Sequence, residues 1–280
     1  MQKIGLIGYG SMGSMLIDAF LSSQILKQEE IIISTRTQTK LELLKQRFPK
    51  IQTVKDNRLL AKECKILFVC VEPMEVKRIL DEIRKEVSRE LHLVSIAACV
   101  TIEYLESVFN GKVTKVIPSV TSEVGFGVSL ICHNSKVGSE DALVVESLFN
   151  AIGSIKVIKE KHFEIAADLT SCAPGLISAI FLEYIKASLP YSDFSPSDTE
   201  DMLVSTFYGT AKLMQERNLG FNEIIKRVAT SGGITERGVE VLRKGLPSLF
   251  DSLFKNTLEK HGEIKGVLKT QFNSNLRTDL

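Results

Sequence analysis

Short apolar runs alternate with amphipathic stretches over roughly the first 160 residues. Residues 11–24 repeat apolar side chains at helical spacing, whereas KILFVCV at 65–71 is apolar at nearly every position. Near-continuous apolar runs joined by helices are typical of parallel strands buried on both faces of a sheet. The pattern predicts strands at 3–8, 30–34, 51–54, 65–71, 91–97, 112–118, 127–132 and 154–158, and helices at 11–24, 39–48, 57–63, 74–87, 101–109 and 139–151. Residues 1–160 are therefore predicted to form a doubly wound α/β domain.

Only helical patterns follow residue 160. Residues 161–189 predict a long helix that is interrupted at the APG segment 173–175. A further helix is predicted from Ser195, a good N-cap residue that is followed by a proline, to about residue 217. Helices are also predicted at 221–229, 235–245 and 246–264, before a polar tail at 269–280 that we expect to fray. Residues 161–280 are thus predicted to be an all-helical second domain.

The predicted helix 246–264 carries a row of apolar side chains on one face. These are Leu249, Phe250, Leu253, Phe254 and Leu258. A face of this kind has to be buried, and helical domains often bury it against a second copy of the chain. We therefore expect the helical domain to form a dimer, and packing inside the domain is the alternative.

A glycine-rich loop follows the first predicted strand directly. GLIGYGSMG places Gly8, Gly10 and Gly13 in a GxGxxG spacing between a strand and a helix. In a Rossmann fold these glycines permit the tight turn, the approach of a pyrophosphate and close packing of the helix on the strand. The first turn of the helix, with Ser11 and Met12, then faces the anion. The loop predicts dinucleotide binding, and the alternative is a strand–helix turn whose glycines coincide by chance.

The end of the second predicted strand distinguishes NAD from NADP. NAD sites usually carry an acidic residue there, which binds the ribose 2′-hydroxyl. The segment STRTQTK has no acid and offers Ser34, Arg36 and Thr37 instead. A guanidinium can bind a 2′-phosphate through two parallel hydrogen bonds. We therefore favour NADP over NAD, and the alternative is that Arg36 is simply a solvated loop residue.

The composition narrows the classes of function. The chain has a net charge of +1, with 44% hydrophobic and 25% charged residues, and it shows no basic stripe. Nucleic-acid and membrane-surface partners are therefore not expected. No apolar run reaches the roughly 20 residues of a membrane span, and the N-terminus lacks a signal-peptide pattern, so we expect a cytoplasmic protein. The cysteines and histidines are scattered without metal-ligand spacing, and no metal site is predicted.

Seven segments, in order along residues 1–265, resemble the pyrroline-5-carboxylate reductase family. They are IGLIGYGSMG at 4–13, STRT at 34–37, FVCVEP at 68–73, VSIAACVTIEYLE at 94–106, KVIPSVTSEVGFG at 115–127, LTSCAPG at 169–175 and ATSGGITERGVEVL at 229–242. The resemblance implies reduction of the cyclic imine of pyrroline-5-carboxylate to L-proline with a hydride from NAD(P)H. It implies a homodimer built by the helical domain, which can assemble further. It also implies that Val71, Pro73, Ala97 and Ser119 contact the cofactor.

The segment 229–242 contains the residues that we expect to bind the substrate. Gly232 and Gly233 can present bare backbone N–H groups to a carboxylate, with Ser231 beside them. Thr230 can add a hydroxyl to the same carboxylate. Thr235 can hydrogen-bond the ring nitrogen and is the catalytic candidate, and it can also cap helix 235–245. No acid–base pair is expected, because the nicotinamide carries the hydride.

Six positions depart from the family pattern. They are Glu72, Cys99, Ser119, Cys172, Ala173 and Ser231. Glu72 stands where a lysine is usual near the cofactor phosphates, and Cys99 stands where a glycine is usual. These differences resemble a branch of the family that includes the late competence protein ComER of bacilli, which is linked to competence, sporulation and biofilm regulation.

Three hypotheses therefore stand. The first is an active reductase of pyrroline-5-carboxylate or a related imino acid. The second is a dinucleotide-binding regulatory protein with weak or lost activity. The third is another β-dehydrogenase-like enzyme with a different substrate, which would usually need a lysine in the middle of the helix between the domains. Lys161 lies at the very start of that predicted helix and Lys186 lies near its end, so neither suits this role.

Overall fold

The computed structural model describes residues 3–88 and 90–273. Within this part of the chain, eight strands form one sheet in the order β3-β2-β1-β4-β5-β6-β7-β8. The strands are β1 (Ile4–Ile7), β2 (Ile31–Ser34), β3 (Gln52–Val54), β4 (Ile66–Val69), β5 (His92–Ser95), β6 (Lys112–Ile117), β7 (Gly127–His133) and β8 (Gly153–Val157). Each of them overlaps a predicted strand. The order reverses between β1 and β4, which confirms the doubly wound Rossmann-type fold.

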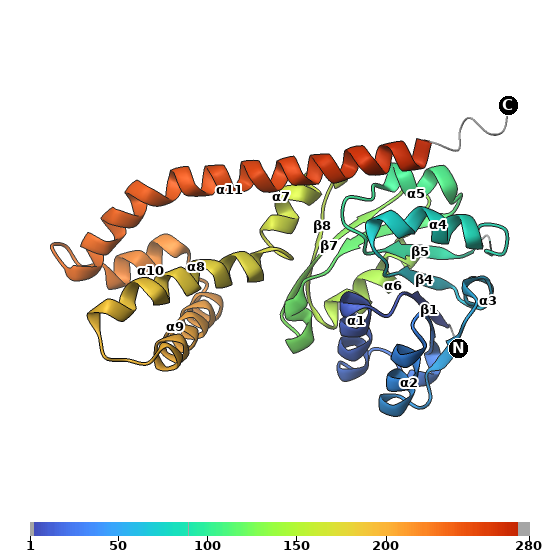
Figure 1. The fold of residues 1–280 in the computed structure, drawn as a ribbon, viewed down its shortest axis with the longest axis horizontal. Coiled ribbons are helices and arrows are strands. Elements are labelled where there is room, and N and C mark those ends of the chain that lie inside the picture. Colours follow the sequence, from blue (N-terminus) through green and yellow to red (C-terminus); the bar gives the residue numbers. More distant parts are fainter. Residues whose placement is uncertain (1–2, 89, 274–280) are drawn as a thin grey trace. The chain divides into compact units, whose positions relative to one another are not determined.

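Helices cover both faces of the sheet (Figure 1). One face packs against α1 (Ser11–Ser22), α2 (Gln38–Arg47) and α6 (Ser139–Asn150), and the other against α3 (Asn57–Glu63), α4 (Pro73–Ile83) and α5 (Ile102–Val108). The strands β1, β2, β4 and β5 are buried at every position. Because both faces of these strands are covered, both need apolar side chains, and this explains the apolar runs without alternation.

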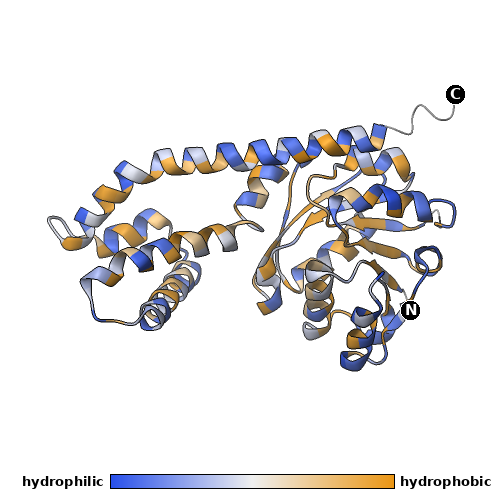
Figure 2. Cartoon of the chain, viewed as in Figure 1, coloured by the Kyte–Doolittle hydropathy of each residue, from blue (hydrophilic) through white to orange (hydrophobic). Residues whose placement is uncertain are grey.

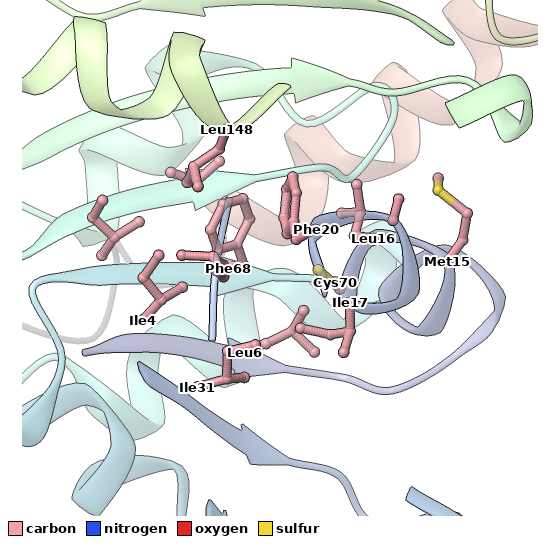
Figure 3. Packing of buried hydrophobic residues seen from close by; sticks show 14 of the residues in the cluster. Ile4, Leu6, Met15, Leu16, Ile17, Phe20, Ile31, Phe68, Cys70 and Leu148 are labelled. Atoms are coloured by element: carbon pink, nitrogen blue, oxygen red, sulfur yellow. The ribbon is translucent and has the colours of Figure 1, made fainter. Parts of the chain in front are cut away.

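Three phenylalanines form the centre of the core on the α1 side of the sheet. Phe20 of α1, Phe68 of β4 and Phe149 of α6 have ring centroids 5.7 to 6.1 Å apart, in tilted or edge-on arrangements. Such arrangements suit the quadrupoles of aromatic rings. Figure 3 shows Phe20 and Phe68 beside each other, with Leu148 of α6 close by. This packing fixes α1 on the sheet and therefore also positions the glycine loop that precedes it.

One strand pair differs from the parallel sheet that was predicted. β6 and β7 run antiparallel, with Val116 opposite Ile131, while the other pairs of neighbouring strands in the described part of the chain are parallel. A parallel pairing needs a crossover of about a dozen or more residues. The connection at 118–126 is shorter and contains only a short 3-10 helix, η2 (Val120–Val124). The expectation of a wholly parallel sheet is therefore wrong at this pair.

The chain divides into two compact units. The first runs to Pro174 and resumes at Thr257, and the second is Gly175–Asn256. The predicted boundary at residue 160 differs from this division because α7 (Phe163–Asp168) belongs with the sheet. Its Phe163 packs in a cluster with Ile117 and Leu130.

The end of the chain also belongs to the first unit. The last part of α11 (Ile234–Asn273) buries Leu268 and Phe272 in the core that contains α4 and α5. The Phe272 ring stacks on Tyr104 of α5 at 5.2 Å between centroids, and the Gln271 side chain donates a hydrogen bond to the Met74 carbonyl oxygen at 2.7 Å. α11 is therefore shared between the two units. The part of the predicted fraying tail at 274–280 lies outside the described residues.

The second unit consists of helices, as predicted. They are α8 (Ala173–Ser188), whose first residues belong to the first unit, α9 (Pro196–Arg217), α10 (Phe221–Val228) and the first part of α11. The Ser195 hydroxyl accepts a hydrogen bond from the Asp198 N–H at 3.1 Å, which confirms the predicted N-cap of α9. Pro174 lies in the first turn of α8, where a missing N–H is tolerated. The interruption of helix 161–189 therefore lies at 169–172 rather than at 173–175.

The predicted helices 235–245 and 246–264 are one continuous helix, α11. Pro247 lies inside it and does not end the helix. A proline in this position removes one backbone hydrogen bond but still allows helical backbone on both sides. The prediction of a helix boundary at residue 246 was wrong for this reason.

Many large apolar side chains of the second unit are exposed. They include Met202, Val204, Phe207, Tyr208, Phe221, Val241 and Leu249, and Figure 2 shows hydrophobic positions along its helices. The stretch Glu160–Tyr191 is long and apolar enough to cross a membrane by length and composition alone, although little of it is buried. On the apolar face predicted in α11, Leu249 and Leu258 are exposed, so the chain alone does not bury that face. Exposed apolar area of this kind marks an interaction surface.

Candidate functional site

A cavity of about 530 Å³ lies at the carboxyl ends of β1, β2, β4 and β5. Ligands of doubly wound sheets bind at this edge, where the strand order reverses. Most of the residues predicted to contact a cofactor line the cavity: Gly8, Gly10, Ser11, Met12, Ser34, Arg36, Thr37, Val71, Pro73 and Ala97. The structure therefore brings together residues from separate loops that the sequence pattern had assigned to one site.

The three glycines of the loop have different surroundings. Gly8 has φ +99°, and a Cβ there would lie 2.3 Å from the Cys70 carbonyl oxygen. A Cβ on Gly13 would lie 2.2 Å from the Gly8 carbonyl oxygen, so this glycine allows α1 to approach the turn closely. Nothing lies within 4 Å of the Cβ position of Gly10, which faces open space on the cavity wall. These are the surroundings that a loop for a pyrophosphate requires, and the residues fit a dinucleotide.

Polar groups gather at the end of β2. The Ser34 hydroxyl donates to Asn57 Oδ1 at 2.7 Å. The Arg36 side chain is 78% exposed, and its Nη1 lies 3.2 Å from Glu75 Oε2. Glu75 also accepts a hydrogen bond from Arg78, and this bond holds the pKa of the Glu75 carboxyl below its usual range. A phosphate at this position would therefore compete with an ionised carboxylate for Arg36.

The wall at the ends of β4 and β5 carries one of the departures from the family pattern, and a second directly follows it. Glu72 is the N-cap residue of α4, with Pro73 at N1, and it lines the cavity. Cys99 follows the wall residues Ala97 and Ala98 and has φ +65°. This left-handed region favours glycine and costs other residues of the order of 1 kcal/mol.

Two predicted cofactor residues lie off the cavity wall. Gly13 packs behind the turn, as its role in helix packing requires. Ser119 is buried, and its hydroxyl donates to the Thr170 carbonyl oxygen at 3.3 Å. The expected contact between Ser119 and the cofactor is therefore not supported by the structure, because the hydroxyl is turned toward the end of α7.

Several wall residues were missed by sequence reasoning. They are Tyr9, Lys55, Asn57, Cys70, Glu75, Arg78, Ile79, Ile96 and Ala98. Lys55 and Asn57 directly follow β3, so the rule that strand ends meet at one edge could have found them. Glu75 and Arg78 are one turn apart on α4. Whether they line the cavity depends on which face of that helix meets the sheet, and the sequence does not show this.

The predicted substrate residues lie in the second unit, whereas the cavity lies in the first. Gly232 has φ +73°, and its N–H donates to Glu236 Oε2 at 2.6 Å. The Gly233 N–H donates to the Thr230 carbonyl oxygen at 2.9 Å. The expectation that both N–H groups are bare is therefore wrong, because a nearby side chain and a tight turn already satisfy them. Thr235 lies inside the first turn of α11 and is not its N-cap, since the helix begins at Ile234.

Among the residues 3–88 and 90–273, no group of three or more His, Cys, Asp or Glu side chains is placed to hold a metal ion.

Comparison with known proteins identifies two family matches. Residues 3–99 match a family described as NADP oxidoreductase coenzyme F420-dependent, and residues 160–264 match one described as pyrroline-5-carboxylate reductase dimerisation. Pyrroline-5-carboxylate reductase 3 of Bacillus subtilis is 36% identical over 93% of this chain and 96% of its own length. ComE operon protein 4 of the same organism is 28% identical over 97% of this chain and all of its own length (100%). The crystal structure of Plasmodium falciparum pyrroline carboxylate reductase with NADP bound is 26% identical, with a TM-score of 0.79 over 95% of this chain and 97% of that one.

Proposed function

Because the chain belongs to the pyrroline-5-carboxylate reductase family, we propose that it reduces pyrroline-5-carboxylate to L-proline with a hydride from NADPH. The observation that carries the proposal is the glycine loop at the cavity, with Gly8 in the turn and Gly10 facing open space. A bound dihydronicotinamide would supply the hydride. The protein then has to bind the imine, orient it and exclude water.

Residues of the first unit would hold the dinucleotide. Gly8, Gly10 and the first turn of α1 would bind the pyrophosphate, since the N–H groups of a helix N-terminus favour an anion. Arg36, with Thr37, would bind a 2′-phosphate. Val71, Pro73 and Ala97 lie on the wall at the ends of β4 and β5. This assignment favours NADP, and the NADP bound in the Plasmodium falciparum relative supports it.

The first turn of α11 would hold the substrate. Because Gly232 and Gly233 already use their N–H groups, the carboxylate would bind to the N–H groups of Ile234 and Thr235, which lack partners within any α-helix. The Thr230 hydroxyl would add a hydrogen bond, with Ser231 beside it. The Thr235 hydroxyl would then hydrogen-bond the ring nitrogen and hold it in place for reduction.

The proposal is tested by following the loss of dihydronicotinamide absorbance when the purified protein is mixed with pyrroline-5-carboxylate. Turnover with NADPH, and slower turnover with NADH, is expected. A folded protein that binds NADPH but shows no turnover above background with either cofactor would contradict the proposed activity.

Replacing Thr235 with valine tests its proposed role. Valine has the shape of threonine without the hydroxyl, so the ring nitrogen would lose a hydrogen-bond partner. We expect kcat/KM for pyrroline-5-carboxylate to fall by about 10- to 100-fold, while the Kd for NADPH stays the same. Thr206→Val is the matched control, because that hydroxyl donates to the Met202 carbonyl oxygen of its own helix. Equal activity in both variants would show that the Thr235 hydroxyl does not contact the substrate.

Replacing Arg36 with alanine tests the cofactor preference. We expect the KM for NADPH to rise by about tenfold and the KM for NADH to change little, since only NADPH carries the 2′-phosphate. Glu75→Gln should act in the opposite direction, because it removes the charge that competes for Arg36. Arg84→Ala, an exposed arginine outside the cavity wall, is the control. An equal change in the KM for NADPH and for NADH would show that Arg36 does not bind the 2′-phosphate.

A second function is favoured by Glu72 on the cavity wall and by the similarity to ComE operon protein 4. A carboxylate there repels the phosphates of a dinucleotide and weakens the binding on which turnover depends. In this alternative the protein binds the dinucleotide and acts as a regulator in competence, sporulation or biofilm formation. It predicts binding with negligible turnover, and partial recovery of activity in the triple variant Glu72→Lys, Cys172→Ser, Ser231→Pro. Ordinary reductase rates in the unmodified protein would exclude it.

We also propose that the protein is a cytoplasmic homodimer. The match of residues 160–264 to a dimerisation family and the exposed apolar side chains of the second unit support self-association. A second copy would cover the apolar helices, including those of Glu160–Tyr191. Sedimentation that shows only monomers at assay concentrations, or recovery of the protein in the membrane fraction, would contradict this assignment.

A further inference from the structure

Cys99 occupies a backbone conformation that a cysteine adopts only at a cost. Its φ is +65°, and strain of this kind persists where the surrounding structure fixes the conformation. Cys99 is 5% exposed and directly follows Ala97 and Ala98, two residues of the cavity wall. The contacts of the Cys99 side chain can therefore influence the position of Ala97 and Ala98.

The Cys99 thiol meets a histidine from the other end of the chain. Cys99 Sγ lies 3.3 Å from His261 Nδ1 of α11. His261 Nε2 faces the Asp168 carboxylate, with 3.6 Å between Nε2 and Oδ1. A thiol and an imidazole nitrogen can each donate or accept, so the Sγ–Nδ1 contact is a hydrogen bond in either tautomer. This contact joins the loop after β5 to α11.

Asp168 is in turn held in place. Its side chain is 1% exposed, and Oδ2 accepts a hydrogen bond from the Thr257 hydroxyl at 2.6 Å. Thr257 and His261 lie one turn apart on α11, so the same face of the helix holds both the carboxylate and the imidazole. All four residues belong to the first unit. They form a partly buried chain of contacts, which we call the Cys99 tether: Cys99, His261, Asp168 and Thr257.

The wall that the tether reaches is the one nearest the reactive end of a dinucleotide. Groups for the adenosine phosphate lie at the end of β2, and the glycine loop lies at β1, so the remaining half of the dinucleotide extends toward β4 and β5. Ala98 also borders a second small cavity, which is lined by Cys99 and His261. Ala98 thus lies between the dinucleotide cavity and Cys99, the first residue of the tether.

We propose that the Cys99 tether positions the wall Ala97–Ala98 for the nicotinamide ring, which makes Cys99 and His261 positioning residues. The proposal rests on the dinucleotide binding proposed above. The thiol–imidazole contact stabilises the left-handed loop against the strain at Cys99, and α11 provides the fixed anchor. α11 is also the helix that begins at the proposed substrate residues. The tether would therefore hold the cofactor wall to the same helix that carries the substrate groups.

The test compares two ligands by titration with the purified full-length protein. NADPH contains the nicotinamide ring, and 2′-phospho-ADP-ribose lacks it. In Cys99→Ala, which keeps the strain and loses the thiol, the Kd for NADPH should rise by about five- to tenfold, with less than about a twofold change for 2′-phospho-ADP-ribose. Cys99→Ser, which keeps a group that can donate or accept a hydrogen bond, should bind NADPH nearly as the unmodified protein does. His261→Gln provides an independent variant from the other side of the contact.

Cys99→Gly distinguishes the effect of the side-chain contact from the effect of the strained backbone. Glycine adopts φ +65° without strain, so this variant should fold, yet it should bind NADPH as weakly as Cys99→Ala does. If Cys99→Gly binds NADPH as tightly as the unmodified protein, the backbone alone sets the wall and the proposal is overturned. An equal loss of both ligands in Cys99→Ala would also overturn it. If the unmodified protein binds neither ligand, the proposed dinucleotide binding fails and this inference fails with it. Cys132→Ala is the control for removal of a thiol elsewhere.

Discussion

Gly8→Ala is expected to weaken NADPH binding by at least about a hundredfold, which corresponds to nearly 3 kcal/mol. Two physical effects add at this position. The φ of +99° lies in a region that alanine adopts only with strain, of the order of 1–3 kcal/mol. The new Cβ would also lie 2.3 Å from the Cys70 carbonyl oxygen, so β1 and β4 would have to move apart at the edge where the cavity opens. Titration of NADPH fluorescence, together with thermal unfolding, measures both consequences.

Gly10→Ala is the matched variant in the same loop. Its φ is ordinary and nothing lies within 4 Å of the added Cβ, so the thermal unfolding temperature should be unchanged. The methyl group would nevertheless face the space that the pyrophosphate is proposed to occupy, and NADPH binding should weaken. A Gly8→Ala variant with a normal unfolding temperature and a Kd within about a factor of two of the unmodified protein would refute the structural assignment of this turn.

The sequence pattern was sufficient for elements whose signals are local. The strands of the sheet follow from apolar runs, because burial on both faces requires apolar residues at successive positions. The glycine loop follows from the spacing of Gly8, Gly10 and Gly13 between a strand and a helix. The direction of β7 was predicted wrongly, although the length of the connection at 118–126 already excluded a crossover. Local rules would have sufficed here if connection length had been weighed together with periodicity.

The features that sequence reasoning missed depend on contacts between distant residues or on side-chain rotamers. Cys99 and His261 are 162 positions apart, and they meet only because the end of α11 packs on the sheet unit. The Gly232 N–H is taken by Glu236, and this requires a particular rotamer four residues along the chain. The sequence alone placed the glycine pair at an anion site but did not indicate which N–H groups remain available.

A buried histidine is expected to make the folded protein markedly less stable in weak acid. His92 is 2% exposed, and burial lowers its pKa from 6.5 to about 4. Its Nε2 lies 2.6 Å from Thr114 Oγ1, which lies 2.7 Å from His133 Nδ1, and His133 Nε2 lies 3.1 Å from Glu146 Oε1. In this series of hydrogen bonds, His92 needs a proton only on Nε2, which faces Thr114. A second proton, on Nδ1, would charge the buried ring and add a donor outside the series.

The direction of the pH dependence follows from proton binding. Between pH 6.5 and pH 4 the unfolded chain binds a proton at His92 that the folded chain does not bind, so stability falls as the pH falls. The contribution is fully present above pH 6.5, and its loss at pH 4.5 is about 2–3 kcal/mol. Urea unfolding at fixed protein concentration should show this loss in the unmodified protein. His92→Gln should show a loss smaller by that amount, and His162→Gln, an exposed histidine, should behave as the unmodified protein does. If both variants lose as much stability as the unmodified protein between pH 7 and pH 4.5, His92 is not the group that titrates.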